Sequence, residues 1–242
     1  INCLNLEFHT ETFKRDGEEK SKKLAIKEIY DYQLAVLNKS KISIGKTLSS
    51  YLDEVGFKEY LIDSVNYSLS TFNKRINKSE FVKGFIRYEK YSRQDFFRIL
   101  NWKKNPVAIN VGGYQVSEDS TNCAIFVTYK KSDEISDSTK YEDEFISPEV
   151  FTYKSKSKRF LTSPDVVSIL SQEKNNIRLP LFVKKSDDEG QSHYYIGELE
   201  LNPSATKQEL MQTKDGKKVS VVNFEFKLDK SVDEDLYKYI IS

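Results

Sequence analysis

The spacing of apolar residues changes near residue 102, from steps of three and four residues to steps of two. Before this point the longer steps predict amphipathic helices at residues 18–37, 47–54, 57–74 and 91–102. A short strand is predicted at residues 4–8. The first part of the chain is therefore expected to be a small helical bundle or a helical connector.

After residue 102, short segments rich in β-branched and aromatic residues alternate with turns of Gly, Asp and Ser. They predict strands at residues 107–116, 124–130, 177–184, 194–201 and 219–228. Helices are expected at residues 163–172 and 233–241. This order indicates the α+β class: an N-terminal helical segment, then a β-rich curled sheet or small barrel with one or two packed helices. We therefore predict a helical connector at residues 1–80 and a β-rich domain at residues 81–242.

The predicted helix at residues 91–102 carries its own start signal. Ser92 fits the N-cap position, and Asp95 stands three residues later, where an acid can complete a capping box. Arg93 lies in the first turn, where a positive charge is unfavourable for the helix dipole. We therefore expect Arg93 to have a carboxylate or a phosphate as its partner.

Composition narrows the class of protein. Charged residues make up 31% of the chain, and no apolar run approaches the roughly 20 residues that span a bilayer. The chain begins with Ile and no signal-peptide core follows, so we expect a fragment of a longer cytoplasmic protein without a membrane partner. Cys3, Cys123, His9 and His193 are too few for a disulfide framework or a zinc site.

Charge is separated sharply between residues 123 and 160. Seven carboxylates lie between Asp133 and Glu149, against the single base Lys140. Four bases and no acid then lie between Lys154 and Arg159. Cationic side chains interleaved with aromatic rings are typical of surfaces that hold a polyanion and stack on its bases. The plain alternative is a solvated acidic loop followed by a solvated strand edge.

An extended segment at residues 151–159 would turn alternate side chains to opposite sides, because a strand has a period of two. One side would line a pocket while the lysines of the other contact phosphates. A base would stack on Tyr153 or Tyr141, and Asp143 would accept a hydrogen bond from an exocyclic amine. The predicted nucleic-acid site comprises Arg93, Tyr141, Asp143, Tyr153, Lys154, Ser155, Lys156, Ser157, Lys158 and Arg159. In the alternative interpretation, Phe151 and Tyr153 are core residues beneath a lysine-rich edge strand.

Enzymatic patterns in the chain are incomplete. The carboxylates Asp143, Glu144 and Glu149 are of the type that a metal-dependent nuclease uses, but the E-x-K step of restriction nucleases is missing. Residues 44–47 look like the end of a phosphate loop, but Ser40 stands where the first glycine is needed. We therefore predict no catalytic residue, metal or cofactor for this chain.

Three blocks of sequence, at residues 91–102, 123–160 and 181–200, resemble a bacterial family of domains of unknown function. Members of that family usually follow a superfamily-2 DEAD/DEAH-box helicase core, sometimes with a phospholipase-D-like nuclease ahead of it. The resemblance runs from about residue 81 to the C-terminus. It implies a place in restriction or phage-defence proteins, with the helicase core of the same longer chain as a partner. It implies no catalytic residue.

Three functions remain open from the sequence. The first is an accessory DNA-binding domain that recognises the target, including a modified or unstacked base. The second is a protein-interaction or autoinhibitory module of the helicase, in which the acidic loop at residues 133–149 would be the working surface. The third is a metal-dependent nuclease.

Overall fold

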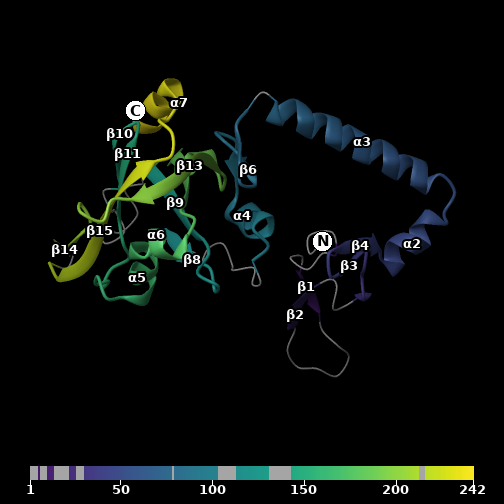
Figure 1. Ribbon diagram of the computed structural model, residues 1–242, viewed down its shortest axis with the longest axis horizontal. Coiled ribbons are helices and arrows are strands. Elements are labelled where there is room, and N and C mark those ends of the chain that lie inside the picture. The colour runs from purple at the N-terminus through teal and green to yellow at the C-terminus, as the bar shows by residue number, and fades with distance from the viewer. Residues whose placement is uncertain are drawn as a thin grey trace. The chain divides into compact units, whose positions relative to one another are not determined.

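The computed structural model describes residues 5, 10–13, 22–25, 30–77, 79–102, 113–130, 143–212 and 216–242. The chain divides into two units, called unit 1 (residues 1–79 and 98–105) and unit 2 (residues 80–97 and 106–242) (Figure 1). Among the described residues, no helix combines the length and the apolar character needed to cross a membrane.

The described residues of unit 1 form two antiparallel strand pairs and two complete helices. They are β1 (Thr10–Phe13), β2 (Lys22–Ala25), β3 (Ala35–Asn38), β4 (Lys41–Ile44), α2 (Lys46–Leu52) and α3 (Phe57–Ile76). The two helices confirm those predicted at residues 47–54 and 57–74.

The helix predicted at residues 18–37 is wrong where β2 and β3 stand. Ala35 pairs with Ile44 in the β3–β4 hairpin, and Lys39 at its turn has a φ of 56°. A left-handed residue such as this one ends any helix, because its backbone cannot continue the right-handed turn. The Asn5 side chain also bonds both backbone groups of Ala35. The rest of the strand predicted at residues 4–8 lies outside the described residues.

Unit 2 is built on a nine-stranded mixed sheet. The strands are β7 (Lys90–Tyr91), β8 (Tyr114–Val116), β9 (Cys123–Lys130), β10 (Glu144–Ser147), β11 (Val150–Lys154), β12 (Pro180–Ser186), β13 (His193–Leu201), β14 (Lys207–Gln212) and β15 (Lys218–Leu228). Their order is β10-β11-β15-β13-β12-β9-β8, with β14 on β15 and β7 on β13. Strands β12 and β9 run parallel, and the other pairs are antiparallel. The α+β class is confirmed, and the described strands form an open sheet rather than a closed barrel.

The remaining elements of unit 2 are short. They are the hairpin strands β5 (Phe81–Val82) and β6 (Phe85–Ile86), helices α4 (Arg93–Ile99), α5 (Pro164–Leu170), α6 (Gln172–Asn175) and α7 (Glu234–Ile241), and the 3₁₀ turn η2 (Asp187–Glu189). Figure 1 shows α5 and α6 near β8, and α7 near β10. The three helices predicted for this unit, at residues 91–102, 163–172 and 233–241, are confirmed in the main. The strands predicted at residues 124–130, 177–184, 194–201 and 219–228 are also confirmed, and β8 is the described end of the strand predicted at residues 107–116. The short strands β5, β6 and β7, and the strands β10 and β14, were not predicted.

Both faces of the central strands are buried, with a different kind of side chain on each. Ile125 and Leu181 belong to the main hydrophobic core, and their own side chains are aliphatic. On the opposite face the Phe126 and Phe182 rings stack with centroids 4.7 Å apart. Side chains of a strand alternate between faces, so each strand serves two cores. The second face, rich in aromatic rings, is the one that α4 covers, since the Phe96 ring lies 5.6 Å from that of Phe182.

The capping box predicted at the start of α4 is confirmed. The Asp95 backbone N–H donates to Ser92 Oγ over 3.1 Å, and the Ser92 backbone N–H donates to Asp95 Oδ2 over 2.9 Å. Just before it, β7 pairs with β13 so that Tyr91 lies opposite His193. The start of α4 is therefore fixed against the first residue of β13, which decides where Arg93 lies.

Candidate nucleic-acid interface

The hairpin of β10 and β11 places the first of the predicted site residues. Asp143 is buried, and its Oδ1 accepts a hydrogen bond from the Lys154 backbone N–H over 3.1 Å. This carboxylate therefore stabilises the open end of the hairpin, and the predicted contact with an exocyclic amine does not fit its position. Lys154 is half-buried at the end of β11. Tyr141 lies outside the described residues.

The aromatic rings of β11 are part of the core. Phe151 is fully buried, Tyr153 is 4% exposed, and the Tyr153 ring lies edge-on to that of Tyr114 with centroids 5.9 Å apart. A ring enclosed on both sides cannot stack on a base. The stacking role predicted for Tyr153 is corrected accordingly, in favour of the alternative in which β11 supplies core residues.

The extended segment predicted to continue to residue 159 ends at Lys154. Ser155 is buried, and its Oγ accepts a hydrogen bond from the Val222 N–H over 2.8 Å. Because a side chain takes the place of the next backbone partner, the ladder between β11 and β15 stops here. Lys158 has a φ of 61° and is exposed, and Ser157 is half-buried. The predicted alternation of Lys156 and Lys158 on one strand face is therefore wrong.

A cavity of about 620 Å³, the Lys156 hollow, lies where this segment meets β8 and α5. It is lined by Tyr114, Gln115, Val116, Lys156, Arg159, Ser163, Pro164 and Asp165. Arg159 Nε donates to Asp165 Oδ2 over 2.8 Å, so these two side chains form an ion pair and neutralise each other. The Lys156 Nζ lies 4.8 Å from the centroid of the Tyr114 ring, and burial lowers the pKa of this lysine. Lys156 forms no ion pair with any described residue.

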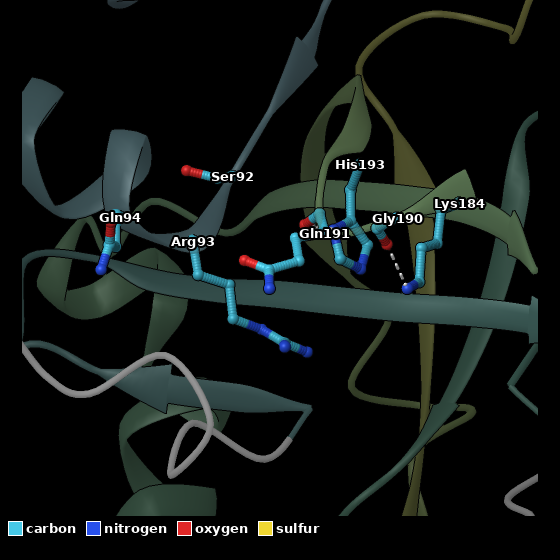
Figure 2. Close-up of a pocket in the computed structure, with 7 residues that line it drawn as sticks. All are labelled: Ser92, Arg93, Gln94, Lys184, Gly190, Gln191 and His193. Atoms are coloured by element: carbon cyan, nitrogen blue, oxygen red, sulfur yellow. Dashed lines mark hydrogen bonds between the residues drawn. The ribbon is translucent and has the colours of Figure 1, made fainter. Parts of the chain in front are cut away.

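A second cavity of about 260 Å³, the Arg93 pocket, lies between the start of α4 and the turn from β12 to β13 (Figure 2). It is lined by Ser92, Arg93, Gln94, Lys184, Gly190, Gln191 and His193. No carboxylate is among these residues. Lys184 donates to the Gly190 carbonyl over 2.8 Å, drawn as the dashed line in Figure 2, and pairs with Asp187 Oδ1 over 2.9 Å.

The other two charged or titratable side chains of this pocket, Arg93 and His193, both pack against the Phe126 ring. The Arg93 Cζ lies 5.2 Å from the centroid of the Phe126 ring, within the range of a cation–π contact. The His193 ring packs against the same ring with centroids 5.3 Å apart and an interplanar angle of 80°. His193 faces this side because it lies two residues before Tyr195, which belongs to the aromatic face.

The protonation of His193 follows from its surroundings. Burial first, and then the charges of Arg93 and Lys184, lower its pKa to about 3, so the ring is neutral near pH 7. Its Nδ1 lies 3.2 Å from the Gln191 carbonyl oxygen, which can only accept, and we therefore assign the proton to Nδ1. His193 Nε2 is then a lone-pair acceptor. Neither this atom nor Arg93 Nε, both shielded from solvent, has a hydrogen-bond partner among the described residues.

Arg93 is thus the one predicted site residue that lies in this pocket, and the sequence had flagged it by its unfavourable place in the first helical turn. His193, Gln191 and Gln94 were missed. The chain has only two histidines, and their scarcity argues against a metal site without indicating a role for His193. The alternation of His193 with Tyr195 in an aromatic strand could have placed it on a buried face.

Two carboxylates that could serve a metal-dependent nuclease form hydrogen bonds within the fold. Glu198, on the strand β13, accepts hydrogen bonds from Arg178 over 2.7 Å and from the Tyr195 hydroxyl over 2.8 Å. Asp143 is bonded within its hairpin. In the ranges that the structure describes, no three His, Cys, Asp or Glu side chains are grouped so that they could hold a metal ion.

Fold and cavities together define an α+β domain whose open mixed sheet carries two cationic hollows. The family model described as "Domain of unknown function (DUF3427)" matches residues 85–240, which is more than half of the chain, and the chain belongs to this family. The identification of such a family from three sequence blocks is confirmed at this level. No curated protein matches the chain.

Two solved structures are similar to parts of the chain. One is described as "Sulfur binding domain and SRA domain of ScoMcrA complexed with phosphorothioated DNA"; it is 7% identical with a TM-score of 0.39, over 64% of this chain and 44% of that one. The other, "crystal structure of KRYPTONITE in complex with mCHG DNA and SAH", is 11% identical with a TM-score of 0.38, over 77% and 41%. The chain spans less than half the length of either. TM-scores below 0.5 do not establish a shared fold or ligand.

Proposed function

We propose that unit 2 is a DNA-binding domain that recognises the target of a larger restriction or phage-defence protein, in which a helicase core supplies the motor. One observation carries this proposal. Arg93 and Lys156 are half-buried cations over aromatic rings, and neither forms an ion pair with any described residue. Partial burial of a charge without a counter-ion costs free energy, and the phosphates of DNA would supply the missing partner.

The two cations lie close to the same two strands, β8 and β9, but over rings on opposite faces of the sheet. Tyr114, beneath Lys156, pairs with Ile125 across β8 and β9. Phe126, beneath Arg93, is the next residue of β9, and its N–H donates to the Gly113 carbonyl over 2.7 Å. Because β8 is the last strand in the order, DNA that contacts both cations would pass around this edge of the sheet. The exposed Lys158 and the half-buried Lys154 extend this surface beyond Lys156.

The test is the salt dependence of DNA binding by the whole chain carrying Arg93→Gln and Lys156→Gln together. Each neutralised phosphate steepens the slope of log K against log salt by about 0.9, so we expect the slope to flatten by about 1.8. Affinity falls in parallel. Fluorescence anisotropy of a labelled duplex over a series of salt concentrations measures both.

A charge-matched control removes one lysine and one arginine from α3, by Lys58→Gln and Arg75→Gln, both of which are exposed. This variant measures what the loss of two charges does anywhere on the chain. Equal slopes for the two variants, or a wild-type chain that binds no DNA, would overturn the proposal. A chain that binds the helicase core but no DNA would instead point to the autoinhibitory function.

A further inference from the structure

The Arg93 pocket has room for a small planar group. Its volume of about 260 Å³ corresponds to about eight or nine water molecules at their share of the liquid volume. A single pyrimidine or purine base is smaller than this and fits inside it. Its lining is polar and cationic rather than aliphatic, so the group that fills it must form hydrogen bonds.

Two atoms that line the pocket have no hydrogen-bond partner among the described residues, and they determine which hydrogen bonds a ligand must form. Arg93 Nε is a donor, because a guanidinium has no acceptor. His193 Nε2 is an acceptor, because Nδ1 carries the proton that the Gln191 carbonyl accepts. A ligand that satisfies both atoms must offer an acceptor to Arg93 and a donor to His193.

This requirement separates the two kinds of group that DNA offers. The oxygens of a phosphodiester only accept, so a phosphate would satisfy Arg93 and bring its negative charge against the lone pair of His193 Nε2. Every nucleobase has a donor beside an acceptor: an amine beside a ring nitrogen in cytosine and adenine, and a ring N–H beside a carbonyl in thymine and guanine. The pocket therefore matches the edge of a base better than a phosphate.

The walls of the pocket also suit a base. The guanidinium of Arg93 is planar and has one face on Phe126, so the other face can stack on a flat ring. In the view of Figure 2, the Gln191 side-chain amide lies between the Arg93 and His193 side chains. The Gln191 and Gln94 amides each combine a donor and an acceptor, and they can adapt to different bases.

We infer that the Arg93 pocket receives a single nucleobase that has left its stack, with Arg93 donating to a base acceptor and His193 Nε2 accepting from a base donor. This inference rests on the proposed DNA-binding function and adds a site for one base to it. The Watson–Crick edge, on which all four bases carry both groups, is occupied in a paired duplex, so a base that binds by this edge must be unpaired to enter.

The test compares three duplexes of one sequence: fully paired, with one unpaired base, and with an abasic residue in place of that base. All three carry the same phosphates. We expect the wild-type chain to bind the duplex with the unpaired base about five- to 150-fold more tightly than the abasic one, which corresponds to the free energy of stacking one base on a side chain. His193→Phe removes the acceptor and leaves a donor of the base unpaired, so it should reduce this ratio by about fivefold or more.

Arg93→Lys is the second variant. It retains the charge but loses the planar group and its Nε–H, so we expect the ratio to collapse while the salt slope on the abasic duplex stays close to the wild-type slope. His193→Gln, which keeps an acceptor, should retain part of the ratio. Equal binding of unpaired-base and abasic duplexes by the wild-type chain would overturn the inference, although a flattened slope in the Arg93 and Lys156 double variant would still support DNA binding.

A separate measurement decides the case in which no duplex binds. His9 and His193 are the only histidines, so their ring nitrogens give few NMR signals, and His193→Gln identifies those of His193. Titration with cytidine and adenosine should shift the His193 Nε2 signal, whereas inorganic phosphate should not. Absence of a nucleoside shift, or a shift with phosphate alone, would refute the base pocket independently of DNA binding.

Discussion

Replacing Arg87 by Met is expected to lower the free energy of unfolding of unit 2 by about 3 kcal/mol, near the low end of the range for removing one partner of a buried ion pair. The Arg87 side chain is 2% exposed. It donates to Asp229 Oδ2 over 2.7 Å, to Glu80 Oε2 over 3.1 Å and to the Ile196 carbonyl over 2.6 Å. The effect stays at the low end because Asp229 and Glu80 are partly exposed and regain water. Urea unfolding followed by circular dichroism measures it.

Lys230→Met is the matched control, because Lys230 pairs with the same Glu80 but is exposed. Exposed pairs contribute up to about 1 kcal/mol, so the control should lose much less stability than the Arg87 variant. Similar losses in both would contradict the assignment. Since Arg87 holds the segment leading into β7 and α4 against β13, we also expect its variant to weaken DNA binding indirectly, through the position of Arg93.

Strong local patterns made most of unit 2 predictable. β9 and β13 are long segments of β-branched and aromatic residues, and the capping box of Ser92 and Asp95 placed the start of α4 to within two residues. Long runs of this composition predict a strand and are rarely found in another secondary structure. The α+β class followed from these elements without knowledge of the strand order.

Short elements were not predicted because the hydrogen bonds that define them join residues far apart in the sequence or leave no periodic pattern of side chains. The β3–β4 hairpin turns at Lys39 and Ser40 without a glycine, so the helical spacing of its apolar residues dominated the prediction. The break after Lys154 depends on Ser155 Oγ reaching the N–H of Val222, 67 residues away. No alternation of side chains along residues 151–159 reveals that bond.

The same reason explains why half of the candidate site was missed. Arg93 and His193 are 100 residues apart in the chain, and they meet through a ladder of two residue pairs, Tyr91 with His193 and Lys90 with Tyr194. A strand as short as β7 has no periodicity to detect. The cationic segment at residues 151–159 does contribute Lys156 to a hollow, but its Phe151 and Tyr153 rings are buried in the core.

Acid should destabilise the wild-type chain more than a His193→Gln variant. The pKa of His193 is lowered to about 3 in the folded chain by burial and by Arg93 and Lys184, with Asp187 opposing them, whereas an unfolded chain has a histidine pKa of about 6.5. Between these values the unfolded state binds a proton that the folded state does not. Stability contributed by the neutral ring is therefore present above about pH 6.5 and is lost as pH falls toward 3, at up to about 1.4 kcal/mol per pH unit.

The quantity to measure is the difference in unfolding free energy between the two chains, at pH 7.5 and at pH 5. Carboxylates common to both cancel in this difference, and we expect it to change by about 2 kcal/mol in favour of the variant at pH 5. A constant difference would mean that His193 titrates alike in folded and unfolded chains. It would then carry a proton on Nε2 in mild acid, and the base pocket would lose its acceptor there. With the lowered pKa, the preference for an unpaired base should instead be constant from pH 8 to about pH 6.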